Sequence, residues 1–244
     1  MATCYDFVFA RLLARTEVDA LLVGDSVAMV VHGHPNTLSA DLPLMRLHTE
    51  AVARGAGEKL VVADIPFLEH RKGVSEAVTA AQTLLRAGAH AVKLEGAAGN
   101  AEIIRHLVEG GVPVMGHVGL TPQFVNAFGG FRVQGKSEEA AERILEGARL
   151  LEAAGCFSLV IEGVPAALGK RITEALAIPT IGIGAGPDCD GQVLVLQDLL
   201  GLTEKPPKFV RAFGQLEAPV LDALSAYARA VKDGSFPAAK ESYG

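Results

Sequence analysis

Short apolar runs rich in β-branched residues alternate along the chain with longer stretches of helical periodicity. Most of these runs are apolar on both faces, which is typical of strands in a parallel sheet that helices cover on both sides. We predict strands at residues 20–23, 60–63, 91–94, 113–115, 158–161, 180–183 and 192–196, after a shortened first strand that begins at Met1. This strand count favours a single (β/α)8 TIM barrel over residues 1–244, with a doubly wound open sheet as the alternative.

The stretches between the predicted strands contain signals for helix starts and stops. We predict helices at residues 41–54, 75–87 and 137–154, each followed by a glycine: Gly55, Gly88 and Gly155. Glycine at this position accepts the left-handed conformation that ends a helix. Ser75 and Ser137 stand at predicted N-caps, where a hydroxyl accepts a bond from a first-turn N–H group. The C-terminal segment 206–244 is predicted to contain one helix, at 216–232.

Composition excludes several classes of partner. The 244 residues are 50% hydrophobic, and 22 basic against 28 acidic residues give a net charge of −6. We therefore expect neither a nucleic-acid partner nor binding to an anionic membrane. The sequence contains no apolar membrane span and no secretory signal pattern, so a cytoplasmic location is expected. Three scattered cysteines match neither a disulfide framework nor a zinc site, and Cys4 and Cys156 are expected to be buried apolar residues.

Polar residues gather where the predicted strands end. In a barrel these carboxyl ends converge on one mouth, where active sites lie. The ends carry Asp6, Asp25 with Ser26, Asp64, Lys93 with Glu95, His117, Glu162, the glycine-rich run 182–186, and Asp198. Asp25, Asp64 and Glu95 offer hard oxygen ligands, which suit magnesium better than zinc.

Two further patterns refine this picture. Lys93 and Glu95 are two residues apart and point the same way along a strand, which puts an ammonium beside a potential metal ligand, where it can hold a substrate carboxylate. The run Gly182-x-Gly184-x-Gly186 is followed by Pro187 and does not match a dinucleotide fingerprint. It is expected to allow close backbone approach after the seventh strand. His32 and His34 are expected to be loop residues, whereas His117 is either a mouth residue or a structural one.

Nearly the whole chain, in order, resembles the ketopantoate hydroxymethyltransferase family. The matching motifs are Val23-Gly-Asp-Ser26, Gly33-His34 with Thr37, Ala63-Asp-Ile-Pro-Phe67, Val92-Lys-Leu-Glu-Gly96, Gly116-His-Val-Gly-Leu-Thr-Pro-Gln123, Val133-Gln-Gly135, Glu162-Gly-Val-Pro165, Gly182-Ile-Gly-Ala-Gly186 and Asp190-Gly-Gln192. The resemblance implies a magnesium-dependent barrel of the phosphoenolpyruvate/pyruvate type. It also implies transfer of a one-carbon unit from 5,10-methylenetetrahydrofolate to 3-methyl-2-oxobutanoate, giving 2-dehydropantoate on the route to pantothenate. Family members are typically cytoplasmic and assemble as homo-oligomers, namely as decamers.

The resemblance also implies roles for individual residues. It assigns one Mg²⁺ per subunit to Asp25 and Asp64, with Glu95 as a third ligand, either direct or through water. Ser26 and Lys93 would hold the keto-acid carboxylate, and Glu162 would be the general base. The expected substrate contacts are Asp25, Ser26, Asp64, Lys93 and His117.

Two other functions remain open at this point. One is another magnesium-dependent 2-oxo-acid carbon–carbon lyase of the same barrel type, although the chain lacks the catalytic cysteine loop typical of such lyases. The other is a non-catalytic oligomeric remnant, against which the intact carboxylates argue. Family members usually carry an additional N-terminal segment and a complete first strand, whereas this chain opens at Met1 with Cys4 in place of an alanine. Either the start codon is assigned too late or the first strand is truncated.

Overall fold

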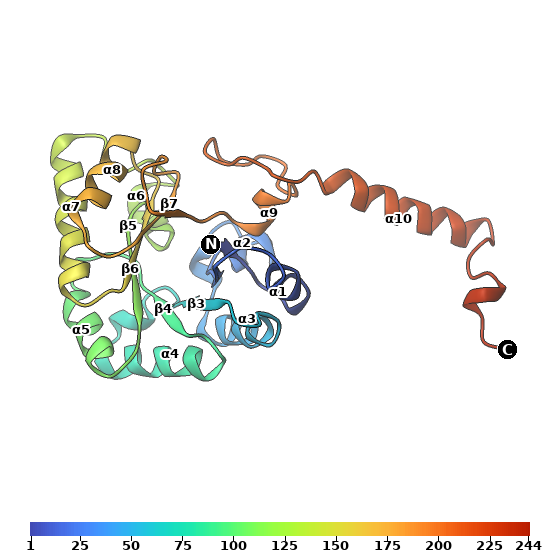
Figure 1. Ribbon diagram of the computed structural model, residues 1–244, viewed down its shortest axis with the longest axis horizontal. Helices are drawn as coiled ribbons and strands as arrows, with labels where there is room; N and C mark the ends of the chain where they lie inside the picture. Colours follow the sequence, from blue (N-terminus) through green and yellow to red (C-terminus); the bar gives the residue numbers. More distant parts are fainter. The chain divides into compact units, whose positions relative to one another are not determined.

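The computed structural model describes residues 1–244 and contains one parallel sheet surrounded by helices (Figure 1). Its strands are β1 (Ala2–Thr3), β2 (Ala20–Val23), β3 (Leu60–Asp64), β4 (Ala91–Lys93), β5 (Val114–Gly119), β6 (Ser158–Glu162), β7 (Thr180–Ile183) and β8 (Gly191–Gln192). Its helices are α1 (Phe7–Leu13), α2 (Val27–Val30), α3 (Leu42–Gly55), α4 (Val74–Arg86), α5 (Ala101–Glu109), α6 (Val125–Phe128), α7 (Glu138–Ala153), α8 (Ala166–Ala175), α9 (Leu196–Leu199) and α10 (Glu217–Lys232). Four short 3₁₀ turns complete it: η1 (Thr37–Ser39), η2 (Glu69–Arg71), η3 (Pro122–Phe124) and η4 (Ala239–Glu241).

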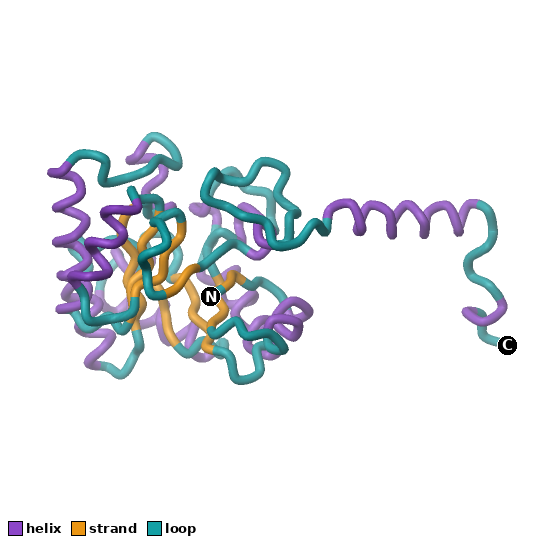
Figure 2. Tube along the Cα trace, turned by 45° about the horizontal axis from the view of Figure 1, so that its top comes forward, coloured by secondary structure: helices purple, strands orange, loops and turns teal.

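The eight strands pair in chain order, and each neighbouring pair is parallel. The N-terminus also lies beside the segment that follows β8. An isolated parallel bridge joins Ala2 to Leu194, and the N–H of Thr3 donates to the carbonyl of Leu194 (3.0 Å). The two edges of the sheet therefore meet, and the predicted α/β fold of the TIM type is confirmed (Figure 2).

Two strands have ends that differ from the prediction by more than one residue. The fifth strand continues to Gly119, four residues beyond its expected end. The eighth strand is restricted to Gly191–Gln192, and residues 196–199 form α9 instead of extending it. The apolar run that follows Gln192 has the pattern of a strand. However, β1 has only two residues and bridges this run only at Leu194, so the strand does not continue.

The helix signals are confirmed at some positions and wrong at others. Ser137 caps α7 by accepting a bond from the N–H of Ala140 (3.2 Å), as predicted. The predicted cap at Ser75 is wrong, because α4 begins one residue earlier, after Gly73. Gly73 has a φ of 144°, a conformation open to glycine, and turns the chain into the helix at that point.

Gly88 and Gly155 have the expected positive φ values, 105° and 100°, but Gly55 does not. Gly55 is the last residue of α3 rather than the residue that ends it. A Cβ at Gly55 would lie 2.7 Å from the carbonyl oxygen of Phe7 and 2.8 Å from Cβ of Ala10. Glycine is therefore required here because α1 and α3 approach each other closely.

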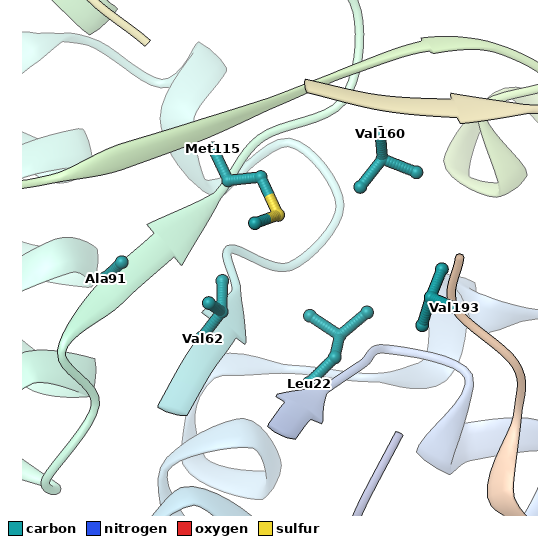
Figure 3. Close-up of a cluster of buried hydrophobic side chains, with 6 residues drawn as sticks. All are labelled: Leu22, Val62, Ala91, Met115, Val160 and Val193. Carbon is teal, nitrogen blue, oxygen red and sulfur yellow. The ribbon is translucent and has the colours of Figure 1, made fainter. Parts of the chain in front are cut away.

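A cluster of buried apolar side chains fills the inside of the sheet, and we call it the interior layer. Figure 3 shows these side chains pointing toward one another from five strands and from the segment after β8. Its members are Leu22, Val62, Ala91, Met115, Val160 and Val193, each at most 6% exposed. Side chains thus pack the interior, as in other barrels of this type, and leave no open pore.

Contacts divide the chain into two compact units, Met1–Val195 and Leu196–Gly244. The first contains all eight strands. The second contains α9, α10 and η4, and α10 covers the helix predicted at 216–232. None of the helices combines the length and the continuous apolar surface needed to cross a bilayer.

Thiol reactivity tests this packing. Cys4 and Cys156 are buried and unpaired, as predicted, and burial raises the pKa of Cys4 to about 11 and that of Cys156 to about 12. Both thiols are therefore protonated near pH 8, and we expect iodoacetamide to alkylate half-buried Cys189 first. Peptide mass spectrometry of native and urea-unfolded protein measures the three rates. Labelling of native Cys4 as fast as Cys189 would contradict the closed sheet.

Candidate active site

A group of polar side chains lies directly beyond the interior layer, and we call it the polar layer. Four of its members follow members of the interior layer by two residues on the same strands: Asp64 after Val62, Lys93 after Ala91, His117 after Met115, and Glu162 after Val160. Because side chains alternate between the faces of a strand, residues two apart point to the same side. Asp25 and Glu95 complete the polar layer from the residues just after β2 and β4.

Three carboxylates of this layer are buried around one ammonium group. Asp25, Asp64 and Glu95 are only 4%, 3% and 2% exposed, and Lys93 is 4% exposed. The Nζ atom of Lys93 lies 3.1 Å from Oδ1 of Asp64 and 3.7 Å from Oε1 of Glu95. The prediction that Lys93 and Glu95 point the same way is confirmed. Lys93 offsets part of a buried negative charge that would otherwise be costly to desolvate.

Asp25 and Asp64 are linked through the backbone. The N–H of Asp25 donates to Oδ2 of Asp64 at 3.0 Å. Burial raises the pKa of Asp25 well above its usual range, and the charges of Glu95 and Asp64 raise it further. Burial also raises the pKa of Asp64, although Lys93 opposes this shift. Both groups therefore favour neutralisation, by a proton or by a cation.

Glu95 has the opposite tendency. Its Oε2 atom accepts a hydrogen bond from the backbone N–H of Gln123 at 2.9 Å, and its Oε1 atom lies 3.4 Å from Nδ1 of His117. Burial opposes ionisation of Glu95, but His117, Lys93 and the Gln123 N–H together lower its pKa. Glu95 is therefore held as a carboxylate by its protein neighbours.

His117 lies between two carboxylates and also touches Lys93. Its Nδ1 atom is 3.2 Å from Lys93 Nζ, and its Nε2 atom is 3.3 Å from Oε2 of Glu162. Burial and Lys93 lower the pKa of His117, but Glu162 and Glu95 outweigh them and raise it to about 9. A neutral ring that accepts from Lys93 at Nδ1 carries its proton on Nε2, and an imidazolium carries protons on both nitrogens. In either form the N–H of Nε2 faces Glu162.

Glu162 ends β6 and is the least buried carboxylate of the layer, with its side chain 17% exposed. The facing residue on β5 is Gly119, whose φ is 93°. A Cβ at Gly119 would lie only 2.2 Å from the carbonyl oxygen of Glu162. Glycine therefore allows β5 to approach the backbone that carries the Glu162 side chain.

Ser26 lies beside Asp25 at the start of α2. Its hydroxyl is not used as a helix cap, and its Oγ atom is 2.8 Å from the hydroxyl of Tyr5. Tyr5 is 2% exposed, and burial raises its pKa, so its phenol stays protonated. A hydrogen bond from Tyr5 to Ser26 leaves the hydrogen of the Ser26 hydroxyl for a ligand.

The structure brings together the seven residues that the sequence singled out: Asp25, Ser26, Asp64, Lys93, Glu95, His117 and Glu162. Asp6 and Asp198 are the two other strand-end acids. Asp6 caps α1 by accepting from the N–H of Phe9 (2.9 Å), and Asp198 lies in α9 of the second unit. His32 and His34 are loop residues, as predicted.

No group of three or more His, Cys, Asp or Glu side chains is arranged as a ready-made metal site. The ammonium of Lys93 lies within 4 Å of both Asp64 and Glu95, so these two carboxylates already share a cation. The ligand set of Asp25, Asp64 and Glu95 therefore stays a prediction, as do the catalytic roles of the other residues.

Sequence reasoning missed three residues that support this layer. Gln123 contacts Asp25 and Glu95, Tyr5 contacts Ser26, and Asn100 donates to the carbonyls of Glu95 and of the next residue (3.0 and 2.7 Å). Gln123 lies in the motif that ends β5, but an amide has no characteristic spacing that marks it as a partner of a distant carboxylate. Tyr5 and Asn100 carried no signal at all.

Comparison with known proteins places the chain in a family. A family model described as ketopantoate hydroxymethyltransferase matches residues 1–239. A protein of Bdellovibrio bacteriovorus named 3-methyl-2-oxobutanoate hydroxymethyltransferase is 56% identical over all of this chain and 93% of its own length. A protein of the same name from Legionella pneumophila is 51% identical, over all of this chain and 94% of its own length.

Solved structures support the fold. The crystal structure of 2,3-dimethylmalate lyase, a member of the PEP mutase/isocitrate lyase superfamily, superposes with a TM-score of 0.62 at 17% identity and covers 99% of this chain and 85% of its own. At this identity the likeness concerns the fold alone. The family match extends over the strands, the polar layer and most of the second unit, and the chain belongs to the ketopantoate hydroxymethyltransferase family.

Proposed function

We propose that this chain transfers a hydroxymethyl group from 5,10-methylenetetrahydrofolate to 3-methyl-2-oxobutanoate, giving 2-dehydropantoate for pantothenate biosynthesis. Water supplies the hydroxyl oxygen, and tetrahydrofolate is the second product. The observation that carries this proposal is the intact polar layer in a chain that matches the family over residues 1–239. The family members named above carry the name of this reaction.

The donor set of the polar layer fits one Mg²⁺ per subunit. Mg²⁺ is usually held by one or two carboxylates, with waters and substrate oxygens completing its shell. Asp25 and Asp64 supply two such carboxylates, and Oδ1 of Asp64 accepts no hydrogen bond of normal geometry. Glu95 is held as a carboxylate by the N–H of Gln123, His117 and Lys93 and would be a third ligand, either direct or through water. When bound, Mg²⁺ would draw electron density from a ketone oxygen and so make the neighbouring C–H more acidic.

Lys93 and Ser26 are proposed to hold the carboxylate of the keto acid. The Lys93 ammonium is charged, because the neighbouring carboxylates raise its pKa despite its burial. The Ser26 hydroxyl is oriented by Tyr5 and lies next to Asp25 in the chain. Together they offer one charge and one hydrogen-bond donor to a carboxylate at the edge of the proposed cation site.

Glu162 is proposed as the general base that removes the proton from C3 of the substrate. The Nε2–H of His117 faces one oxygen of Glu162, which leaves the other oxygen to accept the proton. The C3–H electron pair then forms the new bond to the methylene carbon. The two bonds from this carbon to the folate nitrogens break, water supplies its hydroxyl group, and the nitrogens take up the protons from C3 and from water as tetrahydrofolate leaves. Partial burial limits the access of water to the Glu162 carboxylate, and the interior layer keeps water from reaching the site through the inside of the barrel.

A cytoplasmic location and a homo-oligomeric assembly complete the proposal. The three unpaired cysteines suit a reducing compartment. Within its own unit α10 has no buried residue. It exposes Val220, Leu221, Leu224, Tyr227 and Val231, each 47% to 61% exposed. Spacings of three and four residues place most of these on one face, which we expect a second copy of the chain to cover.

The reaction itself is the first test. We expect the protein with Mg²⁺, 3-methyl-2-oxobutanoate and 5,10-methylenetetrahydrofolate to form 2-dehydropantoate, measured by NMR or chromatography. Exhaustive EDTA treatment should abolish turnover, and added Mg²⁺ should restore it, because Asp25 and Asp64 would lose the cation that polarises the ketone. Unchanged turnover after EDTA would refute the magnesium mechanism. Exchange of the C3 proton without product would point instead to a related lyase.

The Glu162→Gln variant isolates the proton transfer. It should retain Mg²⁺ and substrate binding but exchange the C3 proton with D₂O roughly 10²- to 10⁴-fold more slowly, since an amide is no base. Proton NMR of 3-methyl-2-oxobutanoate in D₂O follows this step without folate. Glu174→Gln, the same change on exposed α8, is the matched control and should behave as wild type. A normal exchange rate in Glu162→Gln would exclude Glu162 as the base.

Substitution in α10 tests the assembly. Leu224→Asp places a charge in the middle of the apolar face, so we expect a smaller particle in sedimentation velocity at equal protein concentration. Asp222→Asn, on the same helix and also exposed, should leave the particle mass unchanged. A monomeric wild type would refute the proposed assembly, and an unchanged mass for Leu224→Asp would remove α10 from the interface.

A further inference from the structure

Gln123 connects the ends of three neighbouring strands. It lies in η3, after β5, and is 3% exposed. Its Nε2 atom donates to Oδ2 of Asp25 at 2.9 Å and to the carbonyl oxygen of Ile65 at 3.0 Å. Because the carbonyl of Ile65 can only accept, a flipped amide would set its oxygen against that carbonyl oxygen. The orientation of this amide is therefore fixed by its surroundings.

The backbone of Gln123 makes a separate contact. Its N–H donates to Oε2 of Glu95 at 2.9 Å. The side chain thus acts on Asp25, and the main chain acts on Glu95. A substitution at position 123 removes the first contact and retains the N–H that makes the second.

The contact with Asp25 determines which of its oxygens is available. Oδ2 is held by the amide of Gln123, so Oδ1 is the oxygen free to bind a ligand in the site. Outer partners of this kind set the orientation of a metal-binding carboxylate and offset part of its desolvation. No other side-chain hydrogen bond to the Asp25 carboxylate occurs in the structure.

We propose that Gln123 is a positioning residue, whose amide holds the Asp25 carboxylate in the orientation that binds the divalent cation. This inference rests on the proposed function, because it assumes that Asp25 is a cation ligand. It also gives the Gly116–Gln123 motif a second role. Besides carrying His117, the motif ends in the residue that orients a ligand of the proposed cation.

Direct metal binding tests the proposal without turnover. Gln123→Met keeps the length of the side chain and removes the amide, so Mn²⁺ should bind about 10- to 100-fold more weakly, by EPR titration without substrates. Gln123→Asn keeps an amide but is one methylene too short to bridge Asp25 and Ile65, and it should weaken binding similarly. Gln82→Met on the exposed face of α4 is the matched control and should bind Mn²⁺ as wild type.

Turnover at varied Mg²⁺ separates positioning from a general structural role. A positioning role predicts that the variants need more Mg²⁺ for half-maximal rate but recover most of the wild-type kcat at saturating Mg²⁺. A purely structural role predicts a lower kcat that excess Mg²⁺ does not restore, and this result would overturn the inference. Circular dichroism checks folding, and if Gln123→Met does not fold, the more conservative Gln123→Asn decides the question.

Two failures remain distinguishable in this experiment. If wild-type protein binds no Mn²⁺, the proposed cation site is wrong, and the inference about Gln123 is wrong with it. If wild type binds Mn²⁺ and both position-123 variants bind it equally well, only the role of Gln123 is overturned.

Discussion

Burial of three carboxylates beside a single ammonium is the constraint on which the rest of the site depends. With Asp25, Asp64 and Glu95 ionised and Lys93 protonated, three negative charges face one positive charge, a net charge of −2 in a region almost without solvent. Such an excess is expensive to desolvate, and the raised pKa of Asp25 expresses this cost. A divalent cation would balance the excess without protonation of either aspartate, and this charge imbalance supports the proposed metal site.

The spacing of two residues between the interior layer and the polar layer explains how a barrel can carry this charge. Val62 and Met115 point inward and pack the interior, and two residues later Asp64 and His117 point the same way. The apolar layer seals the barrel beneath the charged groups, so water cannot reach them from that end (Figure 3). Asp64, Lys93, His117 and Glu162 also stand on strands whose neighbours are fixed by hydrogen bonds, which limits the movement of these groups in the site.

The sequence was sufficient for the fold and for the charged residues, because both follow from periodic patterns. Strand ends can be read from the limits of apolar runs, and in a barrel those ends must converge, which was enough to bring together Asp25, Asp64, Lys93 and Glu162. Features that depend on tertiary contact were not predictable. Gly55 reads as a helix stop but is needed for the approach of α1. Gln123 finds its partners, Asp25 and Ile65, just after β2 and β3 through an amide that has no sequence signature. The short eighth strand likewise depends on its neighbours: it pairs with β7 at two residues, and the two-residue β1 bridges the chain after it only at Leu194.

The contrasting environments of Asp25 and Glu95 divide the polar layer into two halves with different chemistry. Asp25 is pushed toward neutralisation and lies with Asp64, whereas Glu95 is held ionised by His117, Lys93 and the N–H of Gln123. Groups whose surroundings drive their pKa values apart are the ones that take different roles in a reaction. One half is thereby suited to binding a cation and activating a ketone, and the other half, which ends at Glu162, is suited to moving a proton. Lys93 touches both halves, because its ammonium lies 3.1 Å from Oδ1 of Asp64 and 3.7 Å from Oε1 of Glu95. The lysine therefore links the two halves: its positive charge offsets part of the negative charge of both Asp64 and Glu95, while the charge of Glu95 still raises the pKa of Asp25.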